Sequence, residues 1–463
     1  MPNPSRLLGH LRSTFQSGFV RSVATLAGGT AASQAIWLLT TPFLTRLYSS
    51  EDFSVFGAFV ALMSMLSIAA CAGYDNAVVV PDKDEDAASV LALSLFLAFA
   101  LSSLVALVWL IFTMATSLLA QQWLGDLQPY AWALAPVVFV AATFNAVQFW
   151  TSRRRRFSSV ARVRVAQATV GVGTQIGAGM VAATPLGLII GQGLNFLLGV
   201  LVLGHTMVRE LGTYRAAFRM QALRASAYRF RNFALMTTPA LFANSASVQV
   251  PVLIVARAGQ VAEAGFLFLA LRVMQAPLTT IGAAVSQVFY TEAPQAGRDG
   301  RLAGLTHDVL RQLAIVGLGP LIFAGIVGRP VFEIVFGQGW GRAGEIVAWM
   351  VPWLMLQFLA SPISMLLYAL ERQRVDLLLQ LLGMLLRIGP VLAAALLAPN
   401  WLPEVFALTG AAFYAVYLEV LRRVAGLPLR SLMHAIGEAR WIVLAWIALG
   451  MLLRAGIHAI GWA

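Results

Sequence analysis

Polar side chains recur at helical spacing inside long apolar stretches of this chain, and they are its best candidates for chemistry. Residues three, four or seven apart lie on one face of a helix. A polar face is costly against lipid, so such faces should point at protein or at water. For a single serine or threonine, hydrogen bonding between helices is the simpler explanation. Several such faces in one chain favour a polar cavity, formed by Gln34; by Arg272, Gln275 and Thr279; by Gln357, Ser361 and Tyr368; and by Gln380 with Arg387.

Two arginines lie deep within predicted membrane spans. Arg272 is about 15 Å into its helix, and Arg387 is similarly placed. At the bilayer centre an unpaired arginine costs at least ~2.5–3.5 kcal/mol, so each needs an ion pair or a function. Asp75, Glu333 and Glu419 are the candidate ion-pair partners. Because no acid stands beside either arginine in its own helix, both charges are predicted to face one cavity, which would suit an anion such as phosphate.

Asp75 stands near the end of the second predicted span, before the acidic stretch 82–86. A buried acid there would suit a proton or a cation, and a helix cap or an ion pair explains it equally well. The five histidines are scattered, without metal-ligand spacing. The only lysine, Lys83, is not preceded by the glycine of a nucleotide-binding loop. We therefore expect neither a metal nor a cofactor.

The elements that must position these residues are membrane-spanning helices. Hydrophobic residues make up 59% of the 463 and charged residues only 11%, about half the charged share of a soluble domain. A span needs roughly 20 apolar residues, and continuous apolar runs favour helices over a β-barrel. We predict an all-α polytopic protein with twelve core spans at 22–45, 53–80, 87–117, 129–151, 159–183, 185–208, 232–256, 262–290, 306–336, 343–370, 373–398 and 402–421. A weaker run at 440–462 predicts either a thirteenth span or an interfacial helix.

Basic residues divide unevenly between the two sides of this arrangement. Most of the 32 fall in the N-terminal segment and in alternate loops, at 6–21, 83, 153–164, 209–231, 298–311, 372–374 and 422–440. Because basic loops stay in the cytoplasm, the N-terminus is predicted to be cytoplasmic. The net charge of +12 then follows from topology, and contact with anionic lipid explains the run at 153–156 without any nucleic acid.

The spans fall into two sets of six, separated by a basic segment. We predict a cytoplasmic N-terminal segment at 1–21, helix bundles at 22–208 and 232–424, a basic linker at 209–231 and a C-terminal segment at 425–463. Weak similarity between the halves, with Ser54 aligned to Gly265, indicates a parallel repeat. Transporters often bind substrate between such repeats. The loops on the non-cytoplasmic side are short, which disfavours an enzyme acting on that side.

Four stretches carry a resemblance to a known family: "PFLTRLYSSEDFSVFGAF", "GYDNAVVVPDKDEDAASVLALSL", "ALRVMQAPLTTIGAAVSQVFYTEA" and "PWLMLQFLASPISMLLYALERQRVDLLLQ". They are similar to the polysaccharide-biosynthesis membrane proteins, which are oligosaccharide–lipid flippases in the superfamily of the multidrug and toxin extruders (MATE). The resemblance covers roughly residues 20–425. It implies a V-shaped fold of two bundles, alternating access and a central, often cationic cavity. Arg46, Asp75, Arg272 and Gln275 fall in the matching motifs, with gating or ion coupling as the implied role of the first two.

The resemblance also implies a substrate, a polyprenyl-pyrophosphate-linked oligosaccharide. The expected function is its transfer across the bacterial inner membrane for O-antigen, capsule or exopolysaccharide assembly. Arg272, with Arg387, would hold the pyrophosphate, and the other polar faces would bind the sugars. The partners would be the lipid bilayer and the polysaccharide polymerase and chain-length proteins. Two alternatives stay open: a cation-coupled multidrug antiporter of the same fold and, less favoured, a membrane polymerase or ligase.

Overall fold

The computed structural model describes residues 18–115, 125–258, 261–370 and 372–459, and within these ranges every regular element is a helix. Six long helices form the first bundle, namely α2 (Gly18–Leu47), α3 (Ser50–Ala70), α5 (Asp84–Ala115), α7 (Leu134–Arg153), α8 (Phe157–Val181) and α9 (Pro185–Leu211). The second bundle contains α11 (Thr238–Arg257), α12 (Val261–Arg298), α14 (Gly319–Phe336), α15 (Gly341–Ile363), α17 (Gln373–Leu397) and α18 (Leu402–Val424). Each of the twelve predicted core spans therefore coincides with a long helix.

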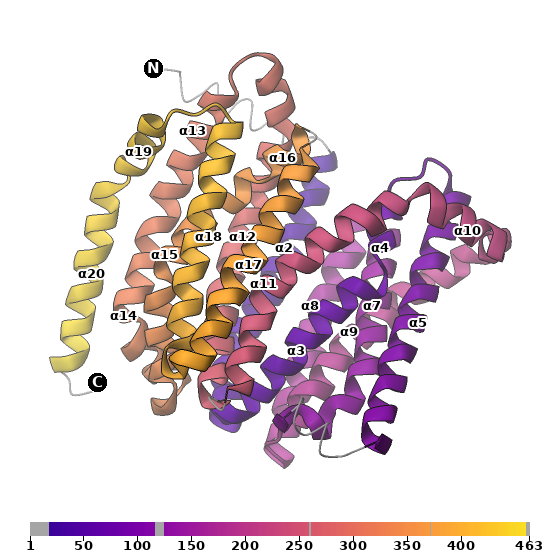
Figure 1. The fold of residues 1–463 in the computed structure, drawn as a ribbon, viewed down its shortest axis with the longest axis horizontal. Coiled ribbons are helices and arrows are strands. Elements are labelled where there is room, and N and C mark those ends of the chain that lie inside the picture. Colours follow the sequence, from indigo (N-terminus) through magenta and orange to yellow (C-terminus); the bar gives the residue numbers. More distant parts are fainter. Residues whose placement is uncertain (1–17, 116–124, 259–260, 371, 460–463) are drawn as a thin grey trace.

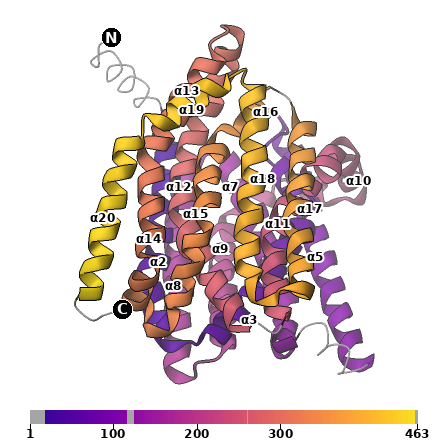
Figure 2. The same cartoon turned by 60° about the vertical axis from the view of Figure 1, so that its left-hand side comes forward.

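A further long helix, α20 (Arg440–Ala459), lies along the outer side of α14 (Figure 2). The Trp446 and Phe323 rings pack edge to face with centroids 5.3 Å apart, while Trp441 and Leu452 stay largely exposed. An apolar helix with an exposed apolar outer face suits lipid on that side. In the described part of the chain, eleven helices are long and apolar enough to cross a membrane, namely α20 and ten of the twelve core helices; α2 and α8, at the predicted spans 22–45 and 159–183, are the two not included. The protein is therefore a multi-pass membrane protein. The length and apolar character of α20 favour a thirteenth span over an interfacial helix.

The two bundles lie side by side, with α3 packed against α11 and α12 (Figure 1). The short helices α4 (Tyr74–Ala77), α10 (Met220–Arg229), α13 (Leu302–Leu313), α16 (Met365–Ala369) and α19 (Leu429–Gly437) all lie at one end. We call this end the basic face, because the basic segments 153–156, 209–231 and 298–311 lie there. The other end, where α3 and α12 begin, is called the opposite face. The ribbons of the two bundles meet at the opposite face and spread apart towards the basic face.

Aromatic rings and a close glycine contact seal the bundles at the opposite face. Trp340, in the short helix η5 (Gln338–Trp340), donates from Nε1 to the Thr45 carbonyl oxygen over 3.1 Å, and its ring centroid is 5.1 Å from that of Phe53. Gly265 lies so close to α3 that a Cβ there would stand 1.9 Å from the Ser50 carbonyl oxygen. Only glycine permits this approach of two helices, so residue 265 sets how tightly the opposite face closes.

Ion pairs hold the loops of the basic face together. Asp84 accepts from Arg153 over 3.0 Å and from Arg154 over 2.7 Å. Glu210 lies 3.4 Å from Arg154 and 2.6 Å from Arg156. The run of arginines at 153–156, which the sequence suggested as a contact with anionic lipid, thus also ties the start of α5 and the end of α9 to the α7–α8 loop.

The second predicted span, 53–80, is wrong at its end, because α3 stops at Ala70. Ala72 and Gly73 adopt left-handed backbone conformations, with φ of 46° and 71°. A Cβ on residue 73 would stand 2.4 Å from Thr238 Oγ1, so the turn needs glycine there for space as well as for its dihedral angle. The apolar run through residue 80 conceals this break, and α4 follows it as a separate short helix.

A substitution at Gly344 should test the packing of the second bundle. A Cβ there would stand 2.3 Å from the Gly328 carbonyl oxygen, because α14 and α15 touch through their backbones. We expect Gly344→Val to cost about 3 kcal/mol, the upper end for an overpacked core, and to lower the thermal unfolding midpoint in detergent. Gly339→Val is the matched control, since nothing lies within 4 Å of that site. Equal midpoints for both variants would contradict this packing.

Candidate functional site

A cavity of about 520 Å³ lies between the two bundles, at the middle of the long helices. It is lined by Gln34 and Trp37 from α2, Val60 from α3, Gln192 and Asn195 from α9, Gln249 from α11, and Arg272, Gln275, Ala276 and Thr279 from α12. The structure therefore brings together four residues that the sequence proposed from two separate helices. We call this space the central cavity.

Among the described residues that line the central cavity, Arg272 alone carries a charge. Its guanidinium carbon lies 4.3 Å from the centroid of the Trp37 ring, with the Phe268 and Phe56 rings at 5.9 and 6.0 Å. These rings offset part of the cost of holding a cation away from water. A guanidinium carries its N–H donors along its edge, and these are the groups that would bind an anionic ligand.

The ion pairs that could have neutralised Arg272 are not formed. No salt bridge within 4 Å involves Arg272 among the described residues. Glu333 pairs instead with Arg329 at 3.2 Å, and Glu419 pairs with Arg422 at 2.6 Å. Asp75 accepts a hydrogen bond from the neighbouring Asn76. The positive charge of Arg272 is therefore available to an anion.

Primary amides form most of the polar lining around Arg272. Gln34 and Gln275 were proposed from the sequence, whereas Gln192, Asn195 and Gln249 were missed because they occur as a pair and as a single residue. The sequence did contain a weaker indication of these three residues, because an amide side chain inside an apolar span is uncommon. Each amide offers both donors and an acceptor, which matches a ligand rich in hydroxyl groups.

A smaller cavity of about 180 Å³ adjoins the first through Thr279. Gln357 and Ser361 of α15 line it together with Ser286 of α12. The Gln275 and Gln357 side chains join the two spaces, because each amide nitrogen lies 3.2 Å from the amide oxygen of the other. Six of the proposed residues thus belong to one continuous polar region between α2, α12 and α15.

Arg387 lies outside this region, inside the second bundle. Only 1% of it is exposed, and it donates from Nη1 to Ser247 Oγ over 3.1 Å. The rings of Trp353, Phe413 and Tyr414 surround its guanidinium at 4.6–5.1 Å. In this conformation the two deep arginines do not share a cavity, so a direct contact of Arg387 with substrate stays a prediction that the geometry does not favour.

Tyr368 and Gln380 do not line the central cavity. Both contact a buried carboxylate within the second bundle. The Tyr368 hydroxyl donates to Asp376 Oδ2 over 2.8 Å, and the Gln380 amide donates to Oδ1 over 3.3 Å. Asp376 is 5% exposed. Both side chains donate to Asp376 within the second bundle, so substrate contact by them also stays a prediction.

The two proposed gating or coupling residues occupy opposite ends of the molecule. Asp75 lies in α4 at the basic face, where burial raises the pKa of its carboxyl group. Arg46 is exposed at the opposite face and donates to the Pro42 carbonyl oxygen over 2.8 Å. Neither lines the central cavity, and their roles stay predictions. No group of three or more potential metal ligands occurs within the described ranges.

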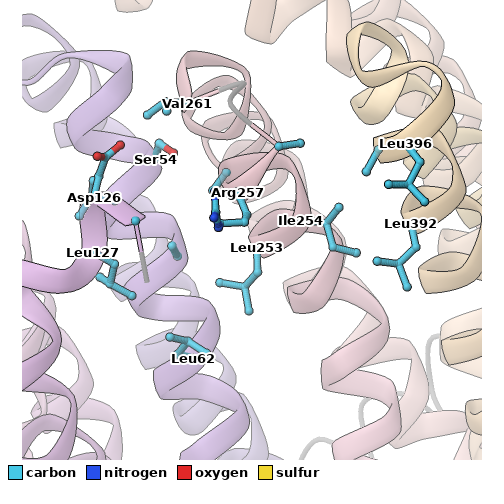
Figure 3. Close-up of a pocket in the computed structure, with 16 residues that line it drawn as sticks. Ser54, Leu62, Asp126, Leu127, Leu253, Ile254, Arg257, Val261, Leu392 and Leu396 are labelled. Carbon is cyan, nitrogen blue, oxygen red and sulfur yellow. The ribbon is translucent and has the colours of Figure 1, made fainter. Parts of the chain in front are cut away.

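A second, larger hollow of about 740 Å³ lies where α3 meets α11, near the opposite face. Figure 3 shows Leu62, Leu253, Leu392 and Leu396 around it, with Arg257, Asp126 and Ser54 also lining it. Leu396 is 86% exposed, as befits a side chain that meets hydrocarbon. We call this hollow the apolar groove, because most of the side chains that line it are aliphatic and could lie against a lipid chain.

Comparison with known proteins gives both a family and a fold. A family model described as "Polysaccharide biosynthesis protein" matches residues 43–345, and no curated protein matches the chain. The lipid II flippase MurJ in an inward closed conformation is similar in structure, with a TM-score of 0.70, 13% identity, and coverage of 94% of this chain and 98% of that one. An inward-facing MATE multidrug transporter is also similar in structure, with a TM-score of 0.61 and 14% identity. The match covers 87% of this chain and 94% of the transporter.

A third solved structure is a transporter of the same superfamily (MOP) from Pyrococcus furiosus, described by a reversed polarity of its binding pocket. The match has a TM-score of 0.57 and 13% identity, and it covers 88% of this chain and 95% of the Pyrococcus furiosus transporter. At these identities the likenesses establish a common fold. They confirm the predicted all-α, two-bundle architecture.

Proposed function

The chain belongs to the polysaccharide biosynthesis protein family, and on this premise we propose that it is a flippase for polyprenyl-pyrophosphate-linked oligosaccharide repeat units. It would carry them across the bacterial inner membrane, from the cytoplasmic basic face to the opposite face, for O-antigen, capsule or exopolysaccharide assembly. The N-terminus would be cytoplasmic. The observation that carries the proposal is Arg272, a cation without a carboxylate partner among the described residues, in an amide-lined cavity between the bundles.

The chemistry of the central cavity matches both parts of this head group. Arg272 binds the pyrophosphate through the edge of its guanidinium, whose fork geometry fits phosphate oxygens. Gln34, Gln275 and Thr279 then face the sugar hydroxyls as donors and acceptors. The polyprenyl tail stays in the bilayer, and the apolar groove gives it a protein surface to lie against.

Transport follows from alternate opening of the two faces. The bundles are sealed at the opposite face by Gly265 and Trp340 and spread towards the basic face, as expected for a state that receives substrate from the basic side. Two negative charges moving outward gain about 4–5 kcal/mol at ~100 mV, inside negative. A coupled ion is therefore compatible with this mechanism and is not required by it.

The alternative with an observation in its favour is a cation-coupled multidrug antiporter. Asp376 is a buried carboxylate in the second bundle, held by Tyr368 and Gln380, and a proton-coupled exporter needs such an acid. None of the described residues that line the central cavity is acidic, which favours an anionic or neutral ligand there. A polymerase or ligase has less support, because the relatives with known structures are transporters. If the chain is the flippase, polysaccharide polymerase and chain-length proteins would be its partners in the pathway.

Reconstitution should test the proposed activity directly. We expect proteoliposomes containing the protein to make lipid-linked oligosaccharide of the inner leaflet accessible to an impermeant glycosidase added outside, at a rate that empty liposomes do not show. Multidrug extrusion predicts proton-dependent efflux of cationic dyes instead. Dye efflux without any movement of the glycolipid would contradict the flippase and support the antiporter.

A further inference from the structure

Arg164 is a second interior arginine that forms no ion pair within 4 Å among the described residues. It lies in α8, partly buried, and donates from Nη1 to Thr30 Oγ1 on α2 and from Nη2 to Gln148 Oε1 on α7 over 3.2 Å. Both acceptors are neutral, so they hold the side chain in place without cancelling its charge. A guanidinium has five donors, and these two hydrogen bonds leave others for a ligand.

Three arginines of the α7–α8 loop, nearer the surface of the basic face, behave differently. Arg153, Arg154 and Arg156 each contact a carboxylate, Asp84 or Glu210. These acids are therefore already engaged by arginines of the α7–α8 loop. Arg164 lies on α8 about two helix turns beyond that loop, and its hydrogen bonds go to Thr30 and Gln148 rather than to either acid.

The face of α2 that lines the central cavity connects Arg164 to Arg272. Thr30, Gln34 and Trp37 lie at i, i+4 and i+7, which places them on one side of this helix. Arg164 is bonded to the first of them, and the guanidinium of Arg272 stacks on the last at 4.3 Å. Seven residues of α helix rise about 10.5 Å. Arg164, Gln34 and Arg272 therefore lie at three successive heights along this side of α2.

The order of these levels follows from the direction of α2. The helix begins on the side of the basic face and ends at Leu47, beside the seal formed by Thr45 and Trp340 at the opposite face. Arg164 is therefore the level nearer the basic face, and Arg272 is the deeper one. An anion that enters from the basic face would reach Arg164 first.

We propose that Arg164 is an outer phosphate-binding station, from which the pyrophosphate of the substrate passes to Arg272. This inference rests on the proposed function and adds to it a two-step capture. Gln34 lies between the two levels and lines the central cavity, so it is placed to bind the head group during the transfer. The outer station raises the local concentration of the anion at the cavity and contributes little to the later movement of the bundles.

Glycolipid flux as a function of substrate concentration should reveal this role. Loss of one charge-assisted contact is worth about a factor of 10 in affinity, so we expect Arg164→Gln to raise the half-saturating concentration about 10-fold with the maximal rate nearly unchanged. Arg164→Lys keeps the charge and should recover part of the loss. Arg162→Gln is the matched control, because Arg162 is exposed on the same helix two residues away.

A binding measurement separates this inference from the proposed function. The probes are geranylgeranyl pyrophosphate and the uncharged alcohol geranylgeraniol, added to the purified full-length protein in detergent. We expect Arg164→Gln to weaken binding of the pyrophosphate only. If Arg164→Gln equals Arg162→Gln while Arg272→Gln loses the pyrophosphate, Arg164 is only a structural tie and the inference is wrong. If neither Arg164→Gln nor Arg272→Gln changes binding of the pyrophosphate, the proposed function itself is wrong.

Discussion

Arg272→Gln should reduce export of the lipid-linked oligosaccharide at least about 100-fold, because two charge-assisted hydrogen bonds to the pyrophosphate are lost at about 1.5 kcal/mol or more each. The side chain lies in the central cavity, lacks a carboxylate partner among the described residues, and rests on Trp37. Glutamine removes the charge and keeps hydrogen-bonding capacity. The measurement is export in a deletion strain complemented with the variant, at matched levels of membrane protein.

The type of residue at this position matters as well as its charge. Arg272→Lys should retain part of the activity, since an ammonium group attracts phosphate but cannot bind it through a planar fork or stack equally well on Trp37. Arg162→Gln removes an exposed arginine of the basic face and should export normally. Wild-type export by Arg272→Gln would show that this arginine does not bind the pyrophosphate.

Gly265→Val should shift the protein away from the conformation described above and slow export at least about 10-fold. Even a single added carbon would stand 1.9 Å from the Ser50 carbonyl oxygen, so the opposite face cannot close as it does here. Overpacking of this kind costs about 1–3 kcal/mol, and any cost above about 1.4 kcal/mol changes the ratio of two conformations tenfold or more. Gly265→Ala should show the same change to a smaller degree.

Thiol labelling can report this shift. Cys71 is the only cysteine of the chain and is buried, so a Cys71→Ala background allows Ser54→Cys as a reporter near the seal. Ser54 is 2% exposed, and Gly265→Val should make it react faster with an impermeant maleimide. Gly297→Val on the same helix is the control, because the nearest atom to a Cβ there is 3.8 Å away. Unchanged labelling together with normal export would argue against a seal at Gly265.

The helices were predictable because each must span the same apolar layer. Length and composition alone located every long helix from α2 to α20. They did not locate the end of α3, since Ala72 and Gly73 turn within a run that stays apolar. The exact division of the chain into domains at 208 and 232 likewise stays a prediction.

The candidate site was predictable only in part, because spacing shows which residues share a helix face but not what that face meets. Arg272, Gln275 and Gln357 meet between the bundles, whereas Tyr368 and Gln380 turn to Asp376 in the second bundle. Arg387 appeared equivalent to Arg272 in depth, yet it is buried inside the second bundle and bonded to Ser247, whereas Arg272 lines the central cavity. Arg164 was counted as a loop residue and lies inside the first bundle, bonded to Thr30. These differences depend on helix rotation and neighbours, which follow from tertiary packing.

The most direct test of the account is leaflet-resolved detection of the lipid-linked oligosaccharide in cells that lack this protein. Spheroplasts would be probed with an impermeant glycan-binding reagent before and after permeabilisation, beside cells complemented with the wild type and with Arg272→Gln. The account predicts that finished repeat units accumulate in the deletion strain and in the Arg272→Gln strain, and bind the reagent only after permeabilisation. Repeat units already accessible in intact spheroplasts of the deletion strain would contradict it, because translocation would then proceed without this protein.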